Sequence, residues 1–260
     1  MYLFSIEAIL ASWPKAVVKL IRKIIKKKQE DVLAQKKNNT MFREKILSAK
    51  DIAIIAEIKF SSPTSPSLGK PTELLQRAKE YEMSGAIAIS IITEKYFFKG
   101  DPAFVTKIKK TVRLPILQKD FVIDESQIYE AKILGVDALL LIARLVTKEK
   151  LRKFVTLCLE LGIEPVVEIN NEEDLEKACI TATKIIAVNA RNLETFAINV
   201  SEACRLLTKI PKKFITLGFS GIHSSDEVLQ YKKAGVKGVL VGTSLMQTKN
   251  IKKFIKELQQ

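Results

Sequence analysis

Residues 52–67 read IAIIAEIKFSSPTSPS, and this stretch indicates how the chain folds. An apolar run ends in a glutamate and a lysine two residues apart, Glu57 and Lys59. Side chains alternate between the faces of a strand, so a strand here would point both charges the same way. Such charges are costly to bury unless they are paired or catalytic. The serine- and proline-rich loop that follows suits a catalytic strand end that opens onto a substrate-binding loop, although a surface ion pair at a strand exit would also explain the pattern.

The same unit repeats along the rest of the chain: an apolar run with many β-branched residues, a polar loop and an amphipathic helix. Four of the helices are followed by glycine, at Gly85, Gly135, Gly162 and Gly235, where a left-handed residue would close the helix. Runs that are apolar throughout predict strands buried on both faces, as in a parallel sheet covered by helices. The predicted strands are 52–58, 86–92, 115–121, 137–142, 164–169, 184–189, 214–217 and 238–241.

Eight alternating strands and helices in a chain of 260 residues predict an α/β fold, a single (β/α)8 TIM barrel. A doubly wound open sheet is the alternative, but no Gly-x-Gly-x-x-Gly motif follows the first strand. We expect the barrel to occupy residues 49–260 and residues 1–48 to form a helical extension packed on it. In that extension a short helix is predicted over 41–48, capped by Thr40.

The extension also contains apolar residues at helical spacing, with lysines and an arginine over much of the remaining surface. This pattern favours an extra helix with a solvated basic face over a helix that binds a membrane surface or nucleic acid. The apolar residues are Val17, Val18, Ile21, Ile24 and Ile25.

The formal net charge of +14 indicates an anionic partner. Aromatic residues are sparse among the basic ones, and no nucleic-acid-binding motif appears, so we favour an anionic small molecule over nucleic acid. No apolar run is long enough for a membrane span, and no basic segment precedes the N-terminal apolar stretch as in a secretory signal. Cys158, Cys179 and Cys204 are widely spaced in predicted helices and form no metal-ligand cluster with His223. These features predict reduced thiols, no metal and a cytoplasmic location.

In a (β/α)8 barrel the functional site forms at the carboxyl ends of the strands. Two lysines, two glutamates and an arginine lie at such ends here, more than structural pairing alone explains. After the last two strands, glycine-exposed amides and hydroxyls are typical of a phosphate site. The candidate residues are Glu57, Lys59, Ser62, Lys119, Glu168, Asn189, Arg191, Ser220, Gly221, Gly242 and Thr243.

Six motifs at these strand ends resemble those of indole-3-glycerol-phosphate synthase, a barrel enzyme of tryptophan biosynthesis. The resemblance extends over roughly residues 20 to 255. The motifs are IAEIK at 55–59 with Ser62-Pro63, QKDF at 118–121, EPVVEI at 164–169, VNARNL at 188–193, SGI at 220–222 and LVGTSLM at 240–246.

The resemblance implies a substrate, 1-(2-carboxyphenylamino)-1-deoxyribulose 5-phosphate, and a ring closure that loses carbon dioxide and water. It implies that Lys119 is the principal general acid at the ketone and Glu168 the general base in dehydration. Lys59 would hold the anthranilate carboxylate and assist proton transfer, while Glu57 would orient the lysines. The chemistry is reasonable without the resemblance, because a partly desolvated lysine beside another cation has a lowered pKa suited to proton donation.

The resemblance further implies that Asn189 and Arg191 position the substrate and its carboxylates. No cofactor is implied, because restoring the aromatic ring drives the loss of carbon dioxide. We expect a monomer, with association with other tryptophan-pathway enzymes left open. Phosphoribosylanthranilate isomerase is an alternative with the same barrel and phosphate site, but it requires a Cys/Asp acid–base pair that is absent here.

The chain departs from the family at the end of the seventh strand. The family has Glu-Ser-Gly where this chain has Phe219-Ser220-Gly221. An aromatic ring thus replaces a carboxylate that faces the substrate. Three explanations compete: an active enzyme with reduced or rerouted proton handling, a deliberately altered variant, or a homologue that binds ligand without turnover.

Overall fold

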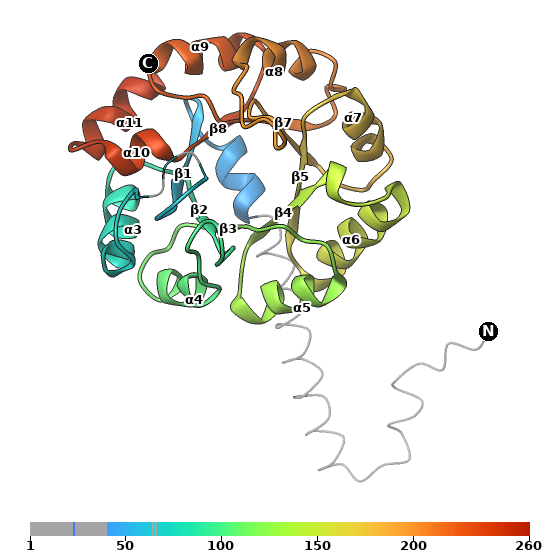
Figure 1. Ribbon diagram of the computed structural model, residues 1–260, viewed down its shortest axis with the longest axis horizontal. Coiled ribbons are helices and arrows are strands. Elements are labelled where there is room, and N and C mark those ends of the chain that lie inside the picture. The colour runs from blue at the N-terminus through green and yellow to red at the C-terminus, as the bar shows by residue number, and fades with distance from the viewer. Residues whose placement is uncertain (1–22, 24–40, 64, 66) are drawn as a thin grey trace.

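Eight parallel strands close into a barrel in the computed structural model, which describes residue 23 and residues 41–63, 65 and 67–260. Each strand is hydrogen-bonded to the next, and β8 pairs with β1, so the predicted (β/α)8 barrel is confirmed. The strands form the inner ring of Figure 1 and the helices the outer one. The strands are β1 (Ala53–Ile58), β2 (Ala88–Ile92), β3 (Ile116–Lys119), β4 (Ala138–Ile142), β5 (Glu164–Ile169), β6 (Ile185–Asn189), β7 (Ile215–Phe219) and β8 (Gly238–Val241).

The helices begin and end at residues with clear local causes. Asp124 and Ser224 form capping boxes at the starts of α5 and α9, and Gly135 and Gly162 close α5 and α6 with φ of 80°. No helix among the described residues is long and apolar enough to cross a membrane. The helices are η1 (Pro71–Glu73), α3 (Leu74–Met83), α4 (Ala103–Lys109), α5 (Glu125–Leu134), η2 (Ala143–Leu145), α6 (Lys148–Leu161), α7 (Glu172–Cys179), α8 (Val200–Leu207), α9 (Ser225–Lys233), α10 (Thr243–Gln247) and α11 (Ile251–Gln259).

Both ends of all eight strands match the prediction to within two residues. Strand β7 was predicted to stop at Leu217 but continues through Gly218 to Phe219. Gly218 is required there because a Cβ would lie 2.4 Å from the ring of Tyr231, which packs against the strand from α9. Gly218 therefore marks the place where helix α9 packs closely against strand β7.

Side chains point alternately to the two faces of each strand, and this divides the buried hydrophobic residues into two clusters. Side chains such as Ala53, Ile55 and Leu217 point inward and fill the barrel, while neighbours such as Ile54 and Ile58 pack against the surrounding helices. Because both faces of every strand are covered, the strands are apolar along most of their length, as the sequence indicated.

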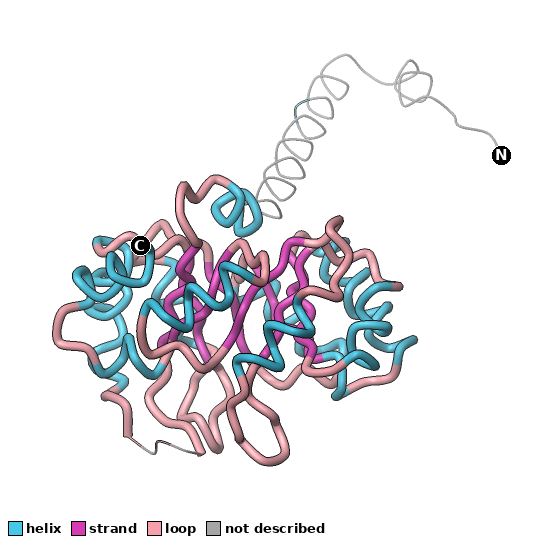
Figure 2. The backbone as a smooth tube through the Cα atoms, turned by 90° about the horizontal axis from the view of Figure 1, so that it is seen from above, coloured by secondary structure: helices cyan, strands magenta, loops and turns pink. Residues whose placement is uncertain are grey.

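A short helix at residues 41–47 closes the amino-terminal end of the barrel. Its Phe42 and Ile46 are buried in the cluster that fills the barrel, and Arg43 Nη1 lies 3.5 Å from Glu164 Oε2 at the start of β5. In Figure 2 this helix caps one end of the barrel, and the long connecting loops lie at the other. Residues 41–47 are helical, as predicted for 41–48, but the predicted cap at Thr40 lies outside the described residues. Of residues 17–25 only Lys23 is described, and it is helical; the remaining predictions for the extension lie outside the described residues.

Candidate active site

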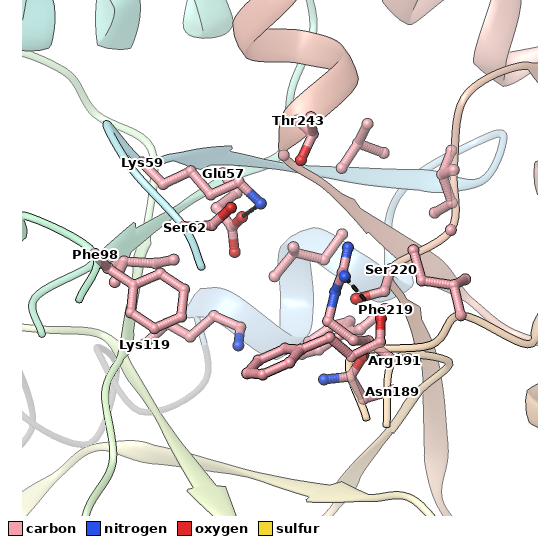
Figure 3. Close-up of a pocket in the computed structure, with 18 of the residues that line it drawn as sticks. Glu57, Lys59, Ser62, Phe98, Lys119, Asn189, Arg191, Phe219, Ser220 and Thr243 are labelled. Atoms are coloured by element: carbon pink, nitrogen blue, oxygen red, sulfur yellow. Dashed lines mark hydrogen bonds and ion pairs between the residues drawn. The ribbon is translucent and has the colours of Figure 1, made fainter. Parts of the chain in front are cut away.

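A cavity of about 360 Å³ opens at the carboxyl ends of the strands. Every candidate residue from the sequence except Glu168 lines it. Figure 3 shows Lys119 pointing into the space between the Glu57–Lys59 pair and the side chains of Asn189 and Arg191. The topology therefore brings residues from most of the strands to one mouth.

Glu57 and Lys59 form an ion pair at the end of β1. The Lys59 ammonium lies 2.9 Å from Glu57 Oε1, and Glu57 is buried. Their common orientation confirms the alternation expected from the sequence. The pair also depends on Gly242 after β8, since a Cβ there would lie 2.2 Å from Glu57 Oε1 and 3.1 Å from the Lys59 ammonium. Gly242 thus leaves room for the carboxylate against the β8 backbone.

Lys119 and Glu168 form a second ion pair of the site. Lys119 is the last residue of β3, and its ammonium nitrogen lies 3.8 Å from Glu168 Oε2. Asn189 donates its side-chain N–H to Glu168 Oε1 at 3.0 Å, whereas no hydrogen bond to Oε2 is formed from the described part of the chain. Glu168 therefore has an unused acceptor oxygen facing a lysine.

Glu168 lies deeper in the barrel than the other candidate residues. Its side chain is only 2% exposed and is not part of the cavity lining. Glu168 pairs in register with Ala187, two residues before Asn189, so it lies one layer of side chains deeper. The carboxylate forms part of the floor beneath Lys119 and Asn189 instead of the open rim.

Arg191 lies just beyond β6, in a loop that folds back on itself. Its backbone N–H donates to Asn189 Oδ1 at 3.0 Å, and its guanidinium Nη1 donates to the carbonyl of Phe196 at 3.0 Å. The same residue forms an antiparallel bridge with Ile198. These contacts hold the guanidinium at the cavity edge before any ligand arrives.

The loop after β7 has an unusual backbone that fits the predicted phosphate site. Ser220 and Gly221 both have positive φ, at 69° and 73°. The buried hydroxyl of Tyr231 donates to the carbonyls of Phe219 and Ser220, each at 3.1 Å. Burial raises the pKa of the Tyr231 phenol above its usual range, so the hydroxyl remains a neutral donor. Those two carbonyls are thereby held away from the cavity.

The loops after β7 and β8 are also joined to each other. The Ser244 hydroxyl donates to the carbonyl of Ile222 at 2.6 Å. Thr243 follows Gly242 at the start of α10, and both line the cavity with Ser220 and Gly221. The four candidate phosphate-binding residues therefore lie on one side of the site.

Sequence reasoning missed the apolar part of the cavity. Phe97 and Phe98 from the loop after β2, Phe121 after β3, and Phe196 and Ile198 after β6 all line it. The aromatic run YFF at 96–98, placed in a loop directly after a predicted strand, was the available signal. These side chains make the site amphipathic, with aromatic rings beside the charged groups.

One carboxylate shapes the aromatic loop. The Glu94 side chain accepts the backbone N–H groups of Tyr96 at 2.8 Å, Phe97 at 2.8 Å and Phe98 at 3.0 Å. Three amides on a single carboxylate hold the turn that presents Phe97 and Phe98 to the cavity.

Phe219 lies in the wall where the family motif has a carboxylate. It is 1% exposed, pairs in register with Asn189 on β6 and Leu240 on β8, and belongs to the apolar cluster inside the barrel. Lys119, Glu168 and Asn189 still form a connected set without it. Among the described residues, no three His, Cys, Asp or Glu side chains are grouped to hold a metal ion.

Fold and site together define a class of protein: a (β/α)8-barrel enzyme whose cavity combines charged side chains, aromatic rings and glycine-containing loops. The model of one family, indole-3-glycerol phosphate synthase, matches residues 6–258. The chain belongs to the indole-3-glycerol phosphate synthase family, which confirms the resemblance drawn from the strand-end motifs.

Individual relatives agree with this assignment. A protein of Lachnoclostridium phytofermentans is 40% identical over 218 residues, which cover 84% of this chain and 80% of that protein. A protein of Caldanaerobacter subterraneus is 41% identical over 210 residues, or 80% of this chain and 82% of that one. A protein of Endomicrobium trichonymphae is 36% identical over 239 residues, or 92% and 93%. All three are named indole-3-glycerol phosphate synthase.

Proposed function

We propose that this protein is a carboxy-lyase that converts 1-(2-carboxyphenylamino)-1-deoxyribulose 5-phosphate to indole-3-glycerol phosphate. The observation that carries the proposal is the arrangement of Lys119 over the buried Glu168, with Asn189 hydrogen-bonded to the same carboxylate. A donor and an acceptor of protons thus lie together at the base of an aromatic-lined cavity.

Ring closure needs a proton donor at the ketone. The aromatic carbon that carries the carboxylate attacks the ketone carbon, and the Lys119 ammonium donates a proton to the ketone oxygen as it becomes a hydroxyl group. Carbon dioxide then leaves, and its bonding electrons restore the aromatic ring. Glu168 then takes a proton from the ring carbon between the nitrogen and the carbon that carries the hydroxyl, while the Lys59 ammonium donates a proton to that hydroxyl, which leaves as water and completes the indole. Positioned acid and base groups typically accelerate such steps by 10²–10⁴-fold.

The other charged residues would hold the two ends of the substrate. Lys59, fixed by Glu57 at 2.9 Å, would bind the anthranilate carboxylate and assist proton transfer. Arg191 and Asn189 would position the substrate from the opposite wall. The aromatic residues after β2 and β3 would enclose the anthranilate ring.

The phosphate would bind at the loops after β7 and β8, against Ser220, Gly221, Gly242 and Thr243, with Ser62 after β1 completing the substrate-binding set. Loops in these positions hold phosphate in many barrels of this kind. We also propose that the enzyme is a cytoplasmic monomer without a cofactor, in keeping with three free cysteines in the described part of the chain.

A non-catalytic ligand-binding homologue is the second candidate, and Phe219 is the observation that favours it. The deciding experiment is to mix the purified protein with the proposed substrate and follow indole fluorescence. We expect indole-3-glycerol phosphate to form, and phosphoribosylanthranilate, the substrate of the isomerase alternative, to remain unchanged. Binding of the substrate without any product would favour the homologue that binds only.

A further inference from the structure

Asn170 lies immediately after β5 and reaches across to the end of β6. Its side-chain nitrogen donates to the carbonyl of Asn189 at 2.7 Å and lies 3.4 Å from the carbonyl of Arg191. An amide nitrogen carries two N–H groups, so one side chain serves both carbonyls. Asn170 therefore joins the loop after β5 to the two residues whose side chains form one wall of the cavity.

Asn170 is itself fixed by a buried carboxylate. Its backbone N–H donates to Asp174 Oδ2 at 3.0 Å, in the first turn of α7. Asp174 is 2% exposed and lies 3.7 Å from the guanidinium Nε of Arg144, which follows β4. The contacts thus connect the loops after β4, β5 and β6.

The three residues that support the cavity wall do not touch the cavity themselves. Asn170, Asp174 and Arg144 are absent from its lining, whereas Asn189 and Arg191 are part of it. The Asn189 side chain also bonds to Glu168, so a shift of the β6 backbone would disturb the acid–base pair together with the guanidinium. Loss of the Asn170 hydrogen bonds to the two backbone carbonyls would allow such a shift.

We propose that Asn170 is a positioning residue that sets the placement of Asn189 and Arg191 for substrate. Small displacements of positioning groups have large kinetic effects, since a misplacement of about 1 Å can reduce the rate about 100-fold. This proposal rests on the proposed function, because the substrate whose placement is affected is the one named there.

The test uses Asn170→Asp in the full chain. Aspartate has nearly the same shape but only acceptor oxygens, which would face two carbonyl oxygens instead of donating to them. The backbone bond from residue 170 to Asp174 is unaffected. We expect KM for the substrate, and Kd for its unreactive analogue in which the ketone is reduced to an alcohol, to rise about tenfold or more.

Asn171→Asp is the matched control. It makes the same chemical change one residue further along, where the side-chain oxygen accepts the Asp174 N–H at 2.8 Å as the cap of α7. Aspartate caps helices as well as asparagine does, so this variant should keep the KM and Kd of the unchanged protein. The two variants should also have closely similar melting temperatures.

The outcomes separate the two proposals. If the unchanged protein makes product and Asn170→Asp keeps KM and Kd within twofold, the positioning role is wrong while the proposed function stands. If KM and Kd rise equally in both variants, the effect is one of added charge and the positioning role is again wrong. If the unchanged protein neither binds the analogue nor turns over substrate, the proposed function fails. Should Asn170→Asp not fold, Asn170→Ala removes the donor without adding charge, and the same comparison applies.

Discussion

At the scale of single residues, Lys119 provides the sharpest test of the chemistry. Its ammonium group lines the cavity and lies 3.8 Å from Glu168 Oε2. Lys119→Met keeps the length and apolar stem of the side chain but removes the proton donor. We expect kcat to fall by about 10²-fold or more with the melting temperature little changed, because the ketone oxygen loses its acid.

The measurement is steady-state indole fluorescence, with Lys110→Met as the control. Lys110 is exposed at the end of α4, away from the cavity lining, so its loss should leave kcat unchanged. A fall of less than about tenfold in Lys119→Met would show that another group supplies the proton.

Phe219 tests whether a carboxylate is missing from this site. Its ring is buried beside Asn189 and Leu240. Lys59, Lys119 and Glu168 still provide an acid and a base, so we expect residual activity. Phe219→Glu should then raise kcat with little change in the Kd of a product-like phosphate ligand, the pattern for an interaction made mainly in the transition state.

The opposing hypothesis is that Phe219 stacks on the anthranilate ring and the site has adapted around it. In that case Phe219→Glu would bind ligand more weakly and turn over no faster. Phe219→Leu is the control, since it removes the ring without adding a carboxylate and should not raise kcat. An unchanged or lower kcat in Phe219→Glu would refute our interpretation.

At the scale of elements, the loops after β7 and β8 are the expected phosphate site. Ser220 and Gly221 after β7 have positive φ, the Tyr231 hydroxyl donates to the carbonyl of Ser220, and the Ser244 hydroxyl joins the two loops. A crystal soaked in phosphate should show an ordered ion against Gly221, Gly242 and Thr243. Density for phosphate elsewhere in the cavity, with none at these loops, would contradict the assignment.

The stability of the protein should depend on pH, because a buried glutamate lies beneath the helix at residues 41–47. Glu164 lies beneath it, 1% exposed, and burial raises the pKa of its carboxyl to about 7 despite the nearby Arg43 and Lys184. An unfolded glutamate has a pKa of about 4.3. The folded state thus favours the protonated form, so the contribution of this group to stability is complete below about pH 4.3 and is lost as the pH rises through 7.

Glu164→Gln removes this titration. The melting temperature of the variant minus that of the unchanged protein should therefore increase between pH 5 and pH 8. Glu176→Gln, on the exposed side of α7, should show no such increase. A difference independent of pH over this range would mean that Glu164 ionises in the folded protein as it does in the unfolded chain.

At the scale of the whole molecule, the net charge of +14 should act on an anionic substrate. A positive field raises the local concentration of anions, and salt screens it. We expect KM for the substrate, which carries a carboxylate and a phosphate, to rise several-fold between about 20 mM and about 500 mM NaCl, with kcat nearly constant. An equal osmolality of sucrose should leave KM unchanged. A KM insensitive to salt would indicate that substrate capture depends on local contacts alone.

The sequence by itself determined the barrel, the family and most of the polar residues that line the cavity, but not its apolar part. The reason is that these features repeat or are local: apolar runs buried on both faces, helix caps, and polar residues at strand ends that a parallel barrel must gather at one mouth. The close packing at Gly218 in β7 was not foreseen, because it depends on the ring of Tyr231, a residue of a later helix.

Two features of the site depend on tertiary structure alone: how deep Glu168 lies in the barrel, and which residues hold the site residues in place. The register between β5 and β6 places Glu168 one layer below Asn189, and no spacing along either strand contains that information. Likewise, Asn170 reaches the carbonyl of Asn189, 19 positions away in the sequence, only because parallel strands bring their carboxyl ends side by side. Which side chains act on the substrate and which hold others in place depends on such contacts between distant segments, and these form only when the barrel closes.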